Sequence, residues 1–216
     1  KELSNGICSL NEGKDRLTLS VIMEIDKQGN VVSSDIRKSV IKVTRRMSYT
    51  DVAILLGLNK EEKTEKIGDV DEAKNKIKAL EKELEVVKKY KPFINHFKRM
   101  EELAHILKDR RTKQGSLNLD LPESKIVLDE NGYAIDVKKY ETYFANEIIE
   151  QFMLIANETV AERFYWLQAP FIYRNHEAPD LDKVKDLNKT LYNFGYKIKI
   201  SKEEIIYPNE FAKILD

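Results

Sequence analysis

The stretch TYFANEIIEQFMLIANETVAERF, from Thr142 to Phe164, decides the fold because it predicts the most apolar helix of the chain. At about 3.6 residues per turn, its apolar side chains fall on one broad stripe. The stripe comprises Phe144, Ala145, Ile148, Ile149, Phe152, Ile155, Ala156 and Val160. A stripe of this width is typical of a helix that packs its apolar face against a protein core.

A narrow polar seam lies on the opposite side of this predicted helix. Asn146, Glu150 and Asn157 are separated by four and seven residues, so their side chains project from the same face. A carboxylate removed from water requires a charged or hydrogen-bonded partner, and we therefore expect Glu150 to have one. Two interpretations remain open at this point: a solvated strip or internal polar network, and a seam that faces a ligand.

The composition is that of an ordinary globular protein of one large or two small domains. The chain has 216 residues, with 37 Lys and Arg against 37 Asp and Glu, so no global basic field indicates a nucleic-acid partner. A single cysteine, Cys8, fits a reducing compartment and is expected to fill the core. No apolar run is long enough to span a bilayer and the charged start KELSNG is not a signal peptide, so the expected location is the cytoplasm, without a membrane partner.

The order of the expected elements predicts an α+β (mixed) fold, in which antiparallel hairpins pack with long helices. Hairpins are expected around the turns Lys27–Asn30 and Asp129–Gly132. The expected helices and the one isolated strand are as follows: a short helix capped by Ser48 and Thr50 and stopped by Gly57, helices from Asp71 to Lys113 interrupted at Pro92, the Thr142–Phe164 helix, a strand at Pro170–His176, and a helix from Asp180 stopped by Gly195.

Common catalytic motifs are absent from the sequence. It contains no P-loop, no dinucleotide fingerprint, no paired-cysteine zinc spacing and no HExxH, so no dinucleotide partner is expected. Of the three histidines, His96 and His105 are nine residues apart, which is not the i, i+4 spacing of a metal pair on a helix. The residue patterns alone therefore predict no catalytic residue and no metal ligand.

Five stretches, taken in order, resemble the RNB domain of the ribonuclease R and ribonuclease II family, and most closely its bacterial ribonuclease R branch. They are LSNGICSLNEGKDRL (Leu3–Leu17), RMSYTDV (Arg46–Val52), GSLNLDLPESKIVLDENG (Gly115–Gly132), EIIEQFMLIANETVA (Glu147–Ala161) and PFIYRNHEAPD (Pro170–Asp180). The resemblance implies a processive exoribonuclease that shortens single-stranded RNA from its 3′ end to nucleoside monophosphates. It also implies that magnesium ions assist the hydrolysis.

The resemblance further implies that residues 1–216 are the central part of one RNB domain, with a helical arm or insertion at about 58–112. The family's metal-binding aspartates would precede this chain and its arginine-rich motif would follow it. The chain begins at Lys1, and we expect it to be a piece of a longer protein. We therefore expect the piece to bind no magnesium and to be inactive alone, and its exposed surfaces to permit a homodimer.

The resemblance assigns substrate contacts rather than catalysis to this chain. Tyr49 and Glu150 match family residues that approach the ribose near the RNA 3′ end, with Asn157 or Asn146 as orienting neighbours. Leu119 stands where many relatives carry a phenylalanine that stacks on a terminal base, so base stacking there is expected to be weaker. Arg174 and His176 match the family without an assigned chemistry, and we expect them to be structural.

A function of another class competes with this one. The helical arm from Asp71 to Lys113 carries Ile77, Leu80, Leu84 and Val87 at heptad-like spacing. Such an arm is also typical of a non-catalytic module that docks onto another protein.

Overall fold

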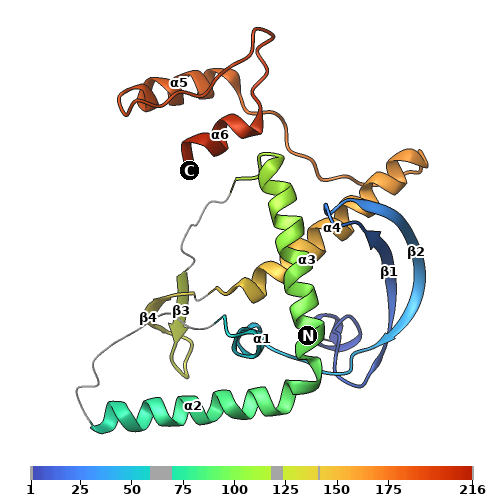
Figure 1. Cartoon of the computed structure of the whole chain (residues 1–216), viewed down its shortest axis with the longest axis vertical. Coiled ribbons are helices and arrows are strands. Elements are labelled where there is room, and N and C mark those ends of the chain that lie inside the picture. Colours follow the sequence, from blue (N-terminus) through green and yellow to red (C-terminus); the bar gives the residue numbers. More distant parts are fainter. Residues whose placement is uncertain (1, 59–69, 118–123, 141, 216) are drawn as a thin grey trace. The chain divides into compact units, whose positions relative to one another are not determined.

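The structure is a computed structural model that describes residues 2–58, 70–117, 124–140 and 142–215 (Figure 1). It separates into two units, one formed by residues 1–105 and 142–166 and the other by residues 106–141 and 167–216. The elements of the first unit are the π-helical turn η1 (Leu3–Ile7), β1 (Asp15–Ile25), β2 (Val31–Lys42), α1 (Tyr49–Leu56), α2 (Val70–Tyr90), η2 (Lys91–Phe93), the first part of α3 (Ile94–Lys113) and α4 (Phe144–Trp166). The elements of the second unit are the end of α3, β3 (Ser124–Leu128), β4 (Ala134–Lys139), α5 (Leu181–Tyr192) and α6 (Pro208–Leu215). The predicted α+β class, with antiparallel hairpins and long helices, is confirmed.

Strands β1 and β2 form a long curved antiparallel ribbon (Figure 1). The predicted turn between them is present, and the carboxylate of Asp26 organises it by accepting hydrogen bonds from the main-chain N–H groups of Gln28 and Asn30 and from the Asn30 amide. These bonds, led by those from Asn30, hold the pKa of the Asp26 carboxyl below its ordinary value. The turn therefore favours the charged form of Asp26.

Helix α1 begins and ends where the sequence predicts. The Ser48 hydroxyl accepts from the Asp51 N–H at 3.1 Å and the Asp51 carboxylate accepts from the Ser48 N–H, which completes a capping box. Thr50 lies inside the first turn and does not cap it. Gly57 ends the helix at φ +73°, a conformation that glycine adopts without strain.

The core next to α1 joins it to α4. Val52, Ala53 and Ala145 are buried together. Partly buried apolar side chains surround them: Met47, Leu56, Leu58, Phe97 and Tyr143. The start of α1 and the N-terminal half of α4 are thus held by one apolar cluster.

The helical segment after α1 is interrupted at Pro92, as predicted. Helix α2 ends at Tyr90, and one 3₁₀ turn with Pro92 separates it from α3. Proline has no N–H to donate to the preceding turn of an α-helix, which explains why the helix restarts at Ile94.

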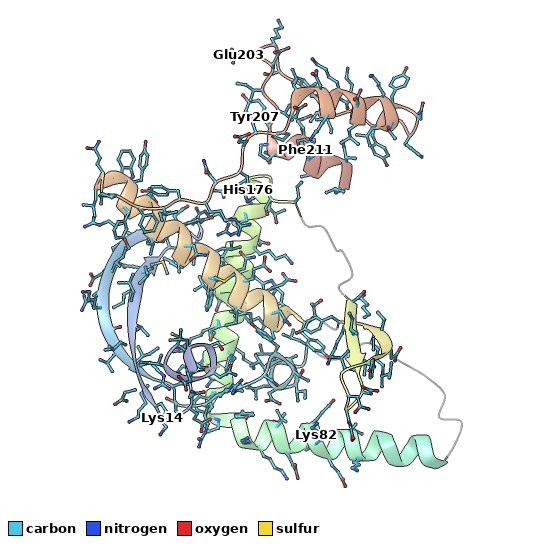
Figure 2. The ribbon with its side chains drawn as sticks, turned by 180° about the vertical axis from the view of Figure 1, so that it is seen from behind. Lys14, Lys82, His176, Glu203, Tyr207 and Phe211 are labelled. Carbon is cyan, nitrogen blue, oxygen red and sulfur yellow. The ribbon has the colours of Figure 1, made fainter. Side chains whose placement is uncertain are left out.

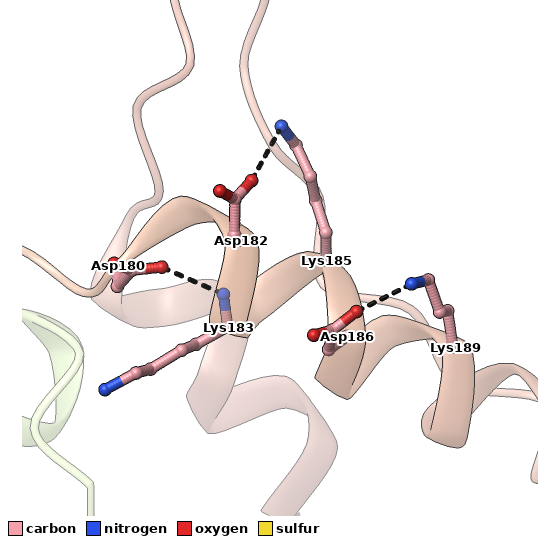
Figure 3. Close-up of polar contacts among 6 residues, drawn as sticks. All are labelled: Asp180, Asp182, Lys183, Lys185, Asp186 and Lys189. Carbon is pink, nitrogen blue, oxygen red and sulfur yellow. Dashed lines mark hydrogen bonds and ion pairs between the residues drawn. The ribbon is translucent and has the colours of Figure 1, made fainter.

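The second unit contains the β3–β4 hairpin and a small helical region. In the predicted hairpin turn, the Asp129 carboxylate accepts from the N–H groups of Asn131 and Tyr133. Asp180 caps α5 by accepting from the Lys183 N–H at 3.0 Å, and the pairs Lys185–Asp182 and Lys189–Asp186 lie along its exposed side (Figure 3). The sequence predicted a helix with Asp180 near its N-terminus, and α5 begins directly after that residue.

Partly buried polar contacts position the chain after α5. Both main-chain groups of the buried Ile198 are bonded to the Asn188 amide, which donates to the Ile198 carbonyl at 3.0 Å and accepts from its N–H at 2.7 Å. The predicted stop, Gly195, has a φ of +82° and lies in the turn that follows Tyr192. Asn188 thereby provides the partner that a neighbouring strand would provide in a sheet.

Two sequence predictions are wrong. Residues 170–176 form no strand, and Arg174 and His176 are exposed in an irregular segment. Figure 2 labels His176 in this segment. Strand propensity is realised only where a partner strand is available, and each hairpin of the described residues pairs only with itself. Cys8 is exposed and does not fill the core. Within the described residues, no helix combines the length and the apolar character that a membrane-spanning segment requires.

Candidate nucleic-acid site on helices α1 and α4

Helix α4 buries a narrower face than its sequence predicts. Five residues spaced by three or four positions are buried: Ala145, Ile148, Gln151, Ile155 and Thr159. Ile149, which belongs to the predicted apolar stripe, is 44% exposed, whereas the polar Gln151 is buried. Hydrophobicity predicted the centre of the stripe, but the packing partners α1, β1 and β2 determine where its edges lie.

The predicted polar seam is an exposed strip of α4. Glu150 and Asn157 are exposed, and Met153, which shares their helix face, is exposed between them. Asn146 is not available on this strip, because its side-chain oxygen accepts from the Tyr143 N–H at 3.0 Å where the helix begins. The Asn146 side chain therefore stabilises the start of the helix and does not orient Glu150.

The expectation that Glu150 has a partner is not met. Its carboxylate is exposed, and it makes no hydrogen bond or ion pair with any residue that the structure describes. Because water solvates the charge, no internal partner is needed to stabilise it. The carboxylate is thus available to a ligand.

A cavity of about 160 Å³ lies between α1, α3 and α4 within the first unit. Its lining consists of Met47, Ser48, Tyr49, Val52, Phe97, Met100, Ala145, Ile148 and Ile149. Tyr49 is 43% exposed and is the first residue of α1, so the capping box of Ser48 and Asp51 fixes its backbone. The cavity is mainly apolar, with one phenol and one hydroxyl among its lining side chains.

Of the predicted site residues that the structure describes, only Tyr49 lies in the lining of this cavity. Tyr49 lines the cavity, whereas Glu150 follows the lining residue Ile149 and is outside the described lining. Asn157 is seven residues beyond Glu150, which is about 10 Å along a helix axis. Leu119 lies outside the described residues. The structure therefore brings Tyr49 next to the turn of α4 that carries Glu150, and it does not bring Asn157 there.

An arginine that the sequence prediction did not include precedes this cavity. The Glu12 carboxylate holds the segment before α1 by accepting from the Arg46 N–H at 2.9 Å and by pairing with Arg45. These contacts, that with the Arg46 main chain first, lower the pKa of Glu12. The Arg46 side chain is exposed and makes no contact of its own with another described residue. Its proximity in sequence to Tyr49 was the signal that could have identified it.

The site can bind and orient a ligand. Over the described ranges, no three His, Cys, Asp or Glu side chains are grouped in a way that could hold a metal ion. The apolar cavity with the Tyr49 phenol in its lining offers a surface for a base and a hydrogen bond for a sugar. The residues that precede Met47 and follow Ile149 in the sequence, Arg46 and Glu150, add an exposed cation and an exposed carboxylate.

Comparison with known proteins identifies close relatives of the chain. Residues 1–215 match the family model described as RNB domain. Ribonuclease R of Thermotoga maritima is 40% identical over 215 residues, which cover 99% of this chain and 26% of the relative. Ribonuclease R of Aquifex aeolicus is 35% identical over 216 residues, which cover 100% of this chain and 27% of the relative. The chain thus spans little more than a quarter of either relative.

Solved structures agree with these relatives. The apo form of Mycoplasma genitalium RNase R matches with a TM-score of 0.76 and 26% identity, over 99% of this chain and 29% of that one. The same values describe the match to that enzyme in complex with ribose methylated single-stranded RNA.

Proposed function

Because this chain belongs to the RNB domain family, we propose that it is the central part of a processive 3′-to-5′ exoribonuclease that releases nucleoside monophosphates. In this proposal, residues 1–216 hold the 3′ end of single-stranded RNA for hydrolysis. The support is the family match over almost the whole chain and a matched structure that was solved with ribose methylated single-stranded RNA. The single cysteine agrees with a cytoplasmic location, which we propose as well.

Magnesium belongs to the proposed parent enzyme and not to this chain. The residues that the structure describes offer no group of three metal-binding side chains, so they do not fit a two-metal site. We therefore assign no metal ligand here and derive no hydrolytic step from these residues. The chain alone is proposed to bind RNA without cleaving it.

The proposed substrate contacts are Tyr49 and Glu150 at a ribose near the 3′ end. The 2′-hydroxyl of ribose can donate to a carboxylate and can exchange hydrogen bonds with a phenol, whereas deoxyribose offers no such group. The observation that carries the assignment is the cavity of about 160 Å³, which Tyr49 lines together with Ile149, the neighbour of the free carboxylate of Glu150. We propose that Leu119 contacts a base and that Asn157 contacts the strand farther along α4.

A binding measurement tests this function. The chain is titrated against a fluorescently labelled oligouridylate and against the matching oligodeoxyuridylate, and anisotropy gives both dissociation constants. We expect the ribose strand to bind more tightly, and Tyr49→Phe, which removes only the phenol oxygen, to reduce that preference. Lys82→Ala on α2, which removes an exposed cation (Figure 2), serves as the control. Equal binding of both strands by the wild-type chain would contradict the proposal.

One observation favours the competing function of a docking module. Leu80 and Leu84 are each 59% exposed on α2 and are four residues apart, so they share one face of the helix. We propose a second copy of this chain as the partner of that face. Sedimentation of the wild-type chain and of the Leu80→Ser, Leu84→Ser double variant tests this dimer. If the two leucines form the interface, the wild-type chain is a dimer and the double variant is a monomer.

A further inference from the structure

A second cavity, of about 220 Å³, lies between the start of β2 and the end of α4 in the first unit. Its lining consists of Val31, Val32, Ser33, Ser34, Thr159, Glu162, Arg163 and Trp166. We call it the Trp166 cavity. It shares no lining residue with the cavity at Tyr49.

A bulge shapes the β2 wall of the Trp166 cavity. Ser33 pairs with Glu24 and Val31 pairs with Ile25, so Val32 is an extra residue on β2. Consecutive residues of a regular strand point to opposite faces, but here four consecutive residues contribute to one cavity. Bulges that redirect side chains in this way are frequent beside functional sites.

The α4 wall is one face of the helix. Thr159, Glu162, Arg163 and Trp166 follow at spacings of three, four and seven residues, which places them on the same side. Thr159 is buried, and its Oγ1 lies 2.8 Å from the Ile155 carbonyl oxygen and 3.2 Å from the Met23 sulfur. The contact between Thr159 and Met23 holds α4 against β1 at the cavity.

Three of the lining side chains from α4 are exposed and can contact a ligand. Trp166 is 73% exposed, and the ring of Tyr165 packs edge-on to it, with 5.2 Å between centroids. Glu162 and Arg163 are exposed and make no ion pair or hydrogen bond with the residues that the structure describes. A large exposed ring beside an unpaired guanidinium presents a stacking surface and a cation to the same ligand.

We propose that the Trp166 cavity binds one nucleotide, with its base stacked on Trp166 and its phosphate paired with Arg163. The indole offers a flat face on which any base stacks, and the guanidinium matches phosphate oxygens with two parallel hydrogen bonds. The Glu162 carboxylate accepts from N–H groups of the base or from a ribose hydroxyl, and the Ser34 hydroxyl donates or accepts beside it. The inference rests on the proposed function in one respect, which is that the nucleotide belongs to an RNA strand.

The same chemistry is present in a free nucleoside 5′-monophosphate and in one residue of a single strand. These two sources differ in reach, because a strand continues beyond the cavity and a mononucleotide does not. Separate titrations with uridine 5′-monophosphate and with an oligouridylate distinguish them. Saturable binding of either one supports the cavity as a nucleotide site.

The sequence supplies its own probe, because Trp166 is the only tryptophan of the chain. A base stacked on its indole quenches its fluorescence, so the titration reports on this cavity and no other. We expect saturable quenching, and we expect Arg163→Gln to weaken binding about tenfold because it removes a charge-assisted contact. Arg99→Gln, which removes another exposed arginine, on α3, is expected to leave binding unchanged.

Anisotropy of a labelled oligouridylate provides the second measurement. Trp166→Ser is expected to weaken binding by about tenfold, and circular dichroism confirms that each variant is folded. The absence of saturable quenching by both ligands, or equal binding by the Arg163→Gln and Arg99→Gln variants, would overturn the proposal. The two proposals can fail separately. Stacking on Trp166 and the phosphate contact affect the binding of RNA and DNA strands alike, whereas Tyr49 and Glu150 are proposed to affect the preference for RNA over DNA.

Discussion

Tyr49 and Ile149 line the same cavity, although a hundred residues of sequence separate them. Tyr49 begins α1 and Ile149 lies in the N-terminal half of α4, and the buried cluster of Val52, Ala53 and Ala145 holds the two helices together beside the cavity. The side chain that follows Ile149 is the free carboxylate of Glu150. The position of the proposed ribose site thus depends on how α1 begins.

The first prediction concerns that helix start. Ser48→Ala removes the hydroxyl of the capping box, and we expect it to destabilise the chain by about 1 kcal/mol. Because Tyr49 is the next residue, RNA binding should weaken in the same variant. Chemical denaturation measures the first effect and anisotropy the second. Ser116→Ala, in a loop after α3, is the control, and an equally stable Ser48→Ala variant would argue against the cap.

A close approach of two segments in the second unit gives the next prediction. Gly115 has a φ of +96°, and a Cβ there would lie 2.7 Å from the backbone nitrogen of Asn209. Gly132 has a similar φ of +87° with open space around it. Gly115→Ala should therefore be more destabilising than Gly132→Ala, by about 1 to 3 kcal/mol for the added clash. Thermal unfolding of both variants measures the difference, and equal losses would show that no clash exists.

The contact between Asn188 and Ile198 can be tested by hydrogen exchange. Asn188→Ala leaves the buried N–H and carbonyl groups of Ile198 without partners, which should destabilise this region by about 1 to 3 kcal/mol. The Ile198 amide should then exchange faster. Asn193→Ala, at the end of α5, keeps the bonds to Ile198 and should leave that exchange rate unchanged.

The hairpin turn at Asp26 gives a pH dependence. Bonds from Asn30 and from the turn backbone hold the pKa of Asp26 below its ordinary value of 3.8. Because the folded-state pKa is the lower one, the charged form stabilises the hairpin fully above the unfolded pKa, and this stabilisation is lost as the pH falls through the folded pKa. We expect the melting temperature to fall as the pH is lowered through the folded-state pKa of Asp26. In the Asp26→Asn variant, the melting temperature should fall less over the same pH range. The same slope in both proteins would assign the acid sensitivity to other carboxylates.

Local signals in the sequence predicted much of the fold. Ser48 and Gly57 marked the ends of α1, Pro92 marked the break between α2 and α3, and both hairpin turns were recognisable from Asp, Asn and Gly. These features depend on a few neighbouring residues, so the sequence contains the whole cause. The strand expected at residues 170–176 depended on a distant partner, which local patterns do not specify.

The candidate site was predictable only in part. Family resemblance indicated Tyr49 and Glu150, but whether Glu150 is buried depends on which edge of α4 packs against its neighbours. The Trp166 cavity was missed because it needs a bulge at Val32 and one face of α4 together. The spacing of residues along the sequence does not predict that two such distant segments line one cavity.

The most direct test of ribose recognition removes the last two 2′-hydroxyls from the RNA and one charge from the protein. Affinities are measured for an oligouridylate and for the same strand with 2′-deoxyuridine in its last two positions, using the wild-type chain and Glu150→Gln. The proposed hydrogen bond to a charged group predicts that the deoxy substitution weakens wild-type binding about tenfold and weakens Glu150→Gln binding much less. An equal loss of affinity in the two proteins would contradict ribose recognition by Glu150.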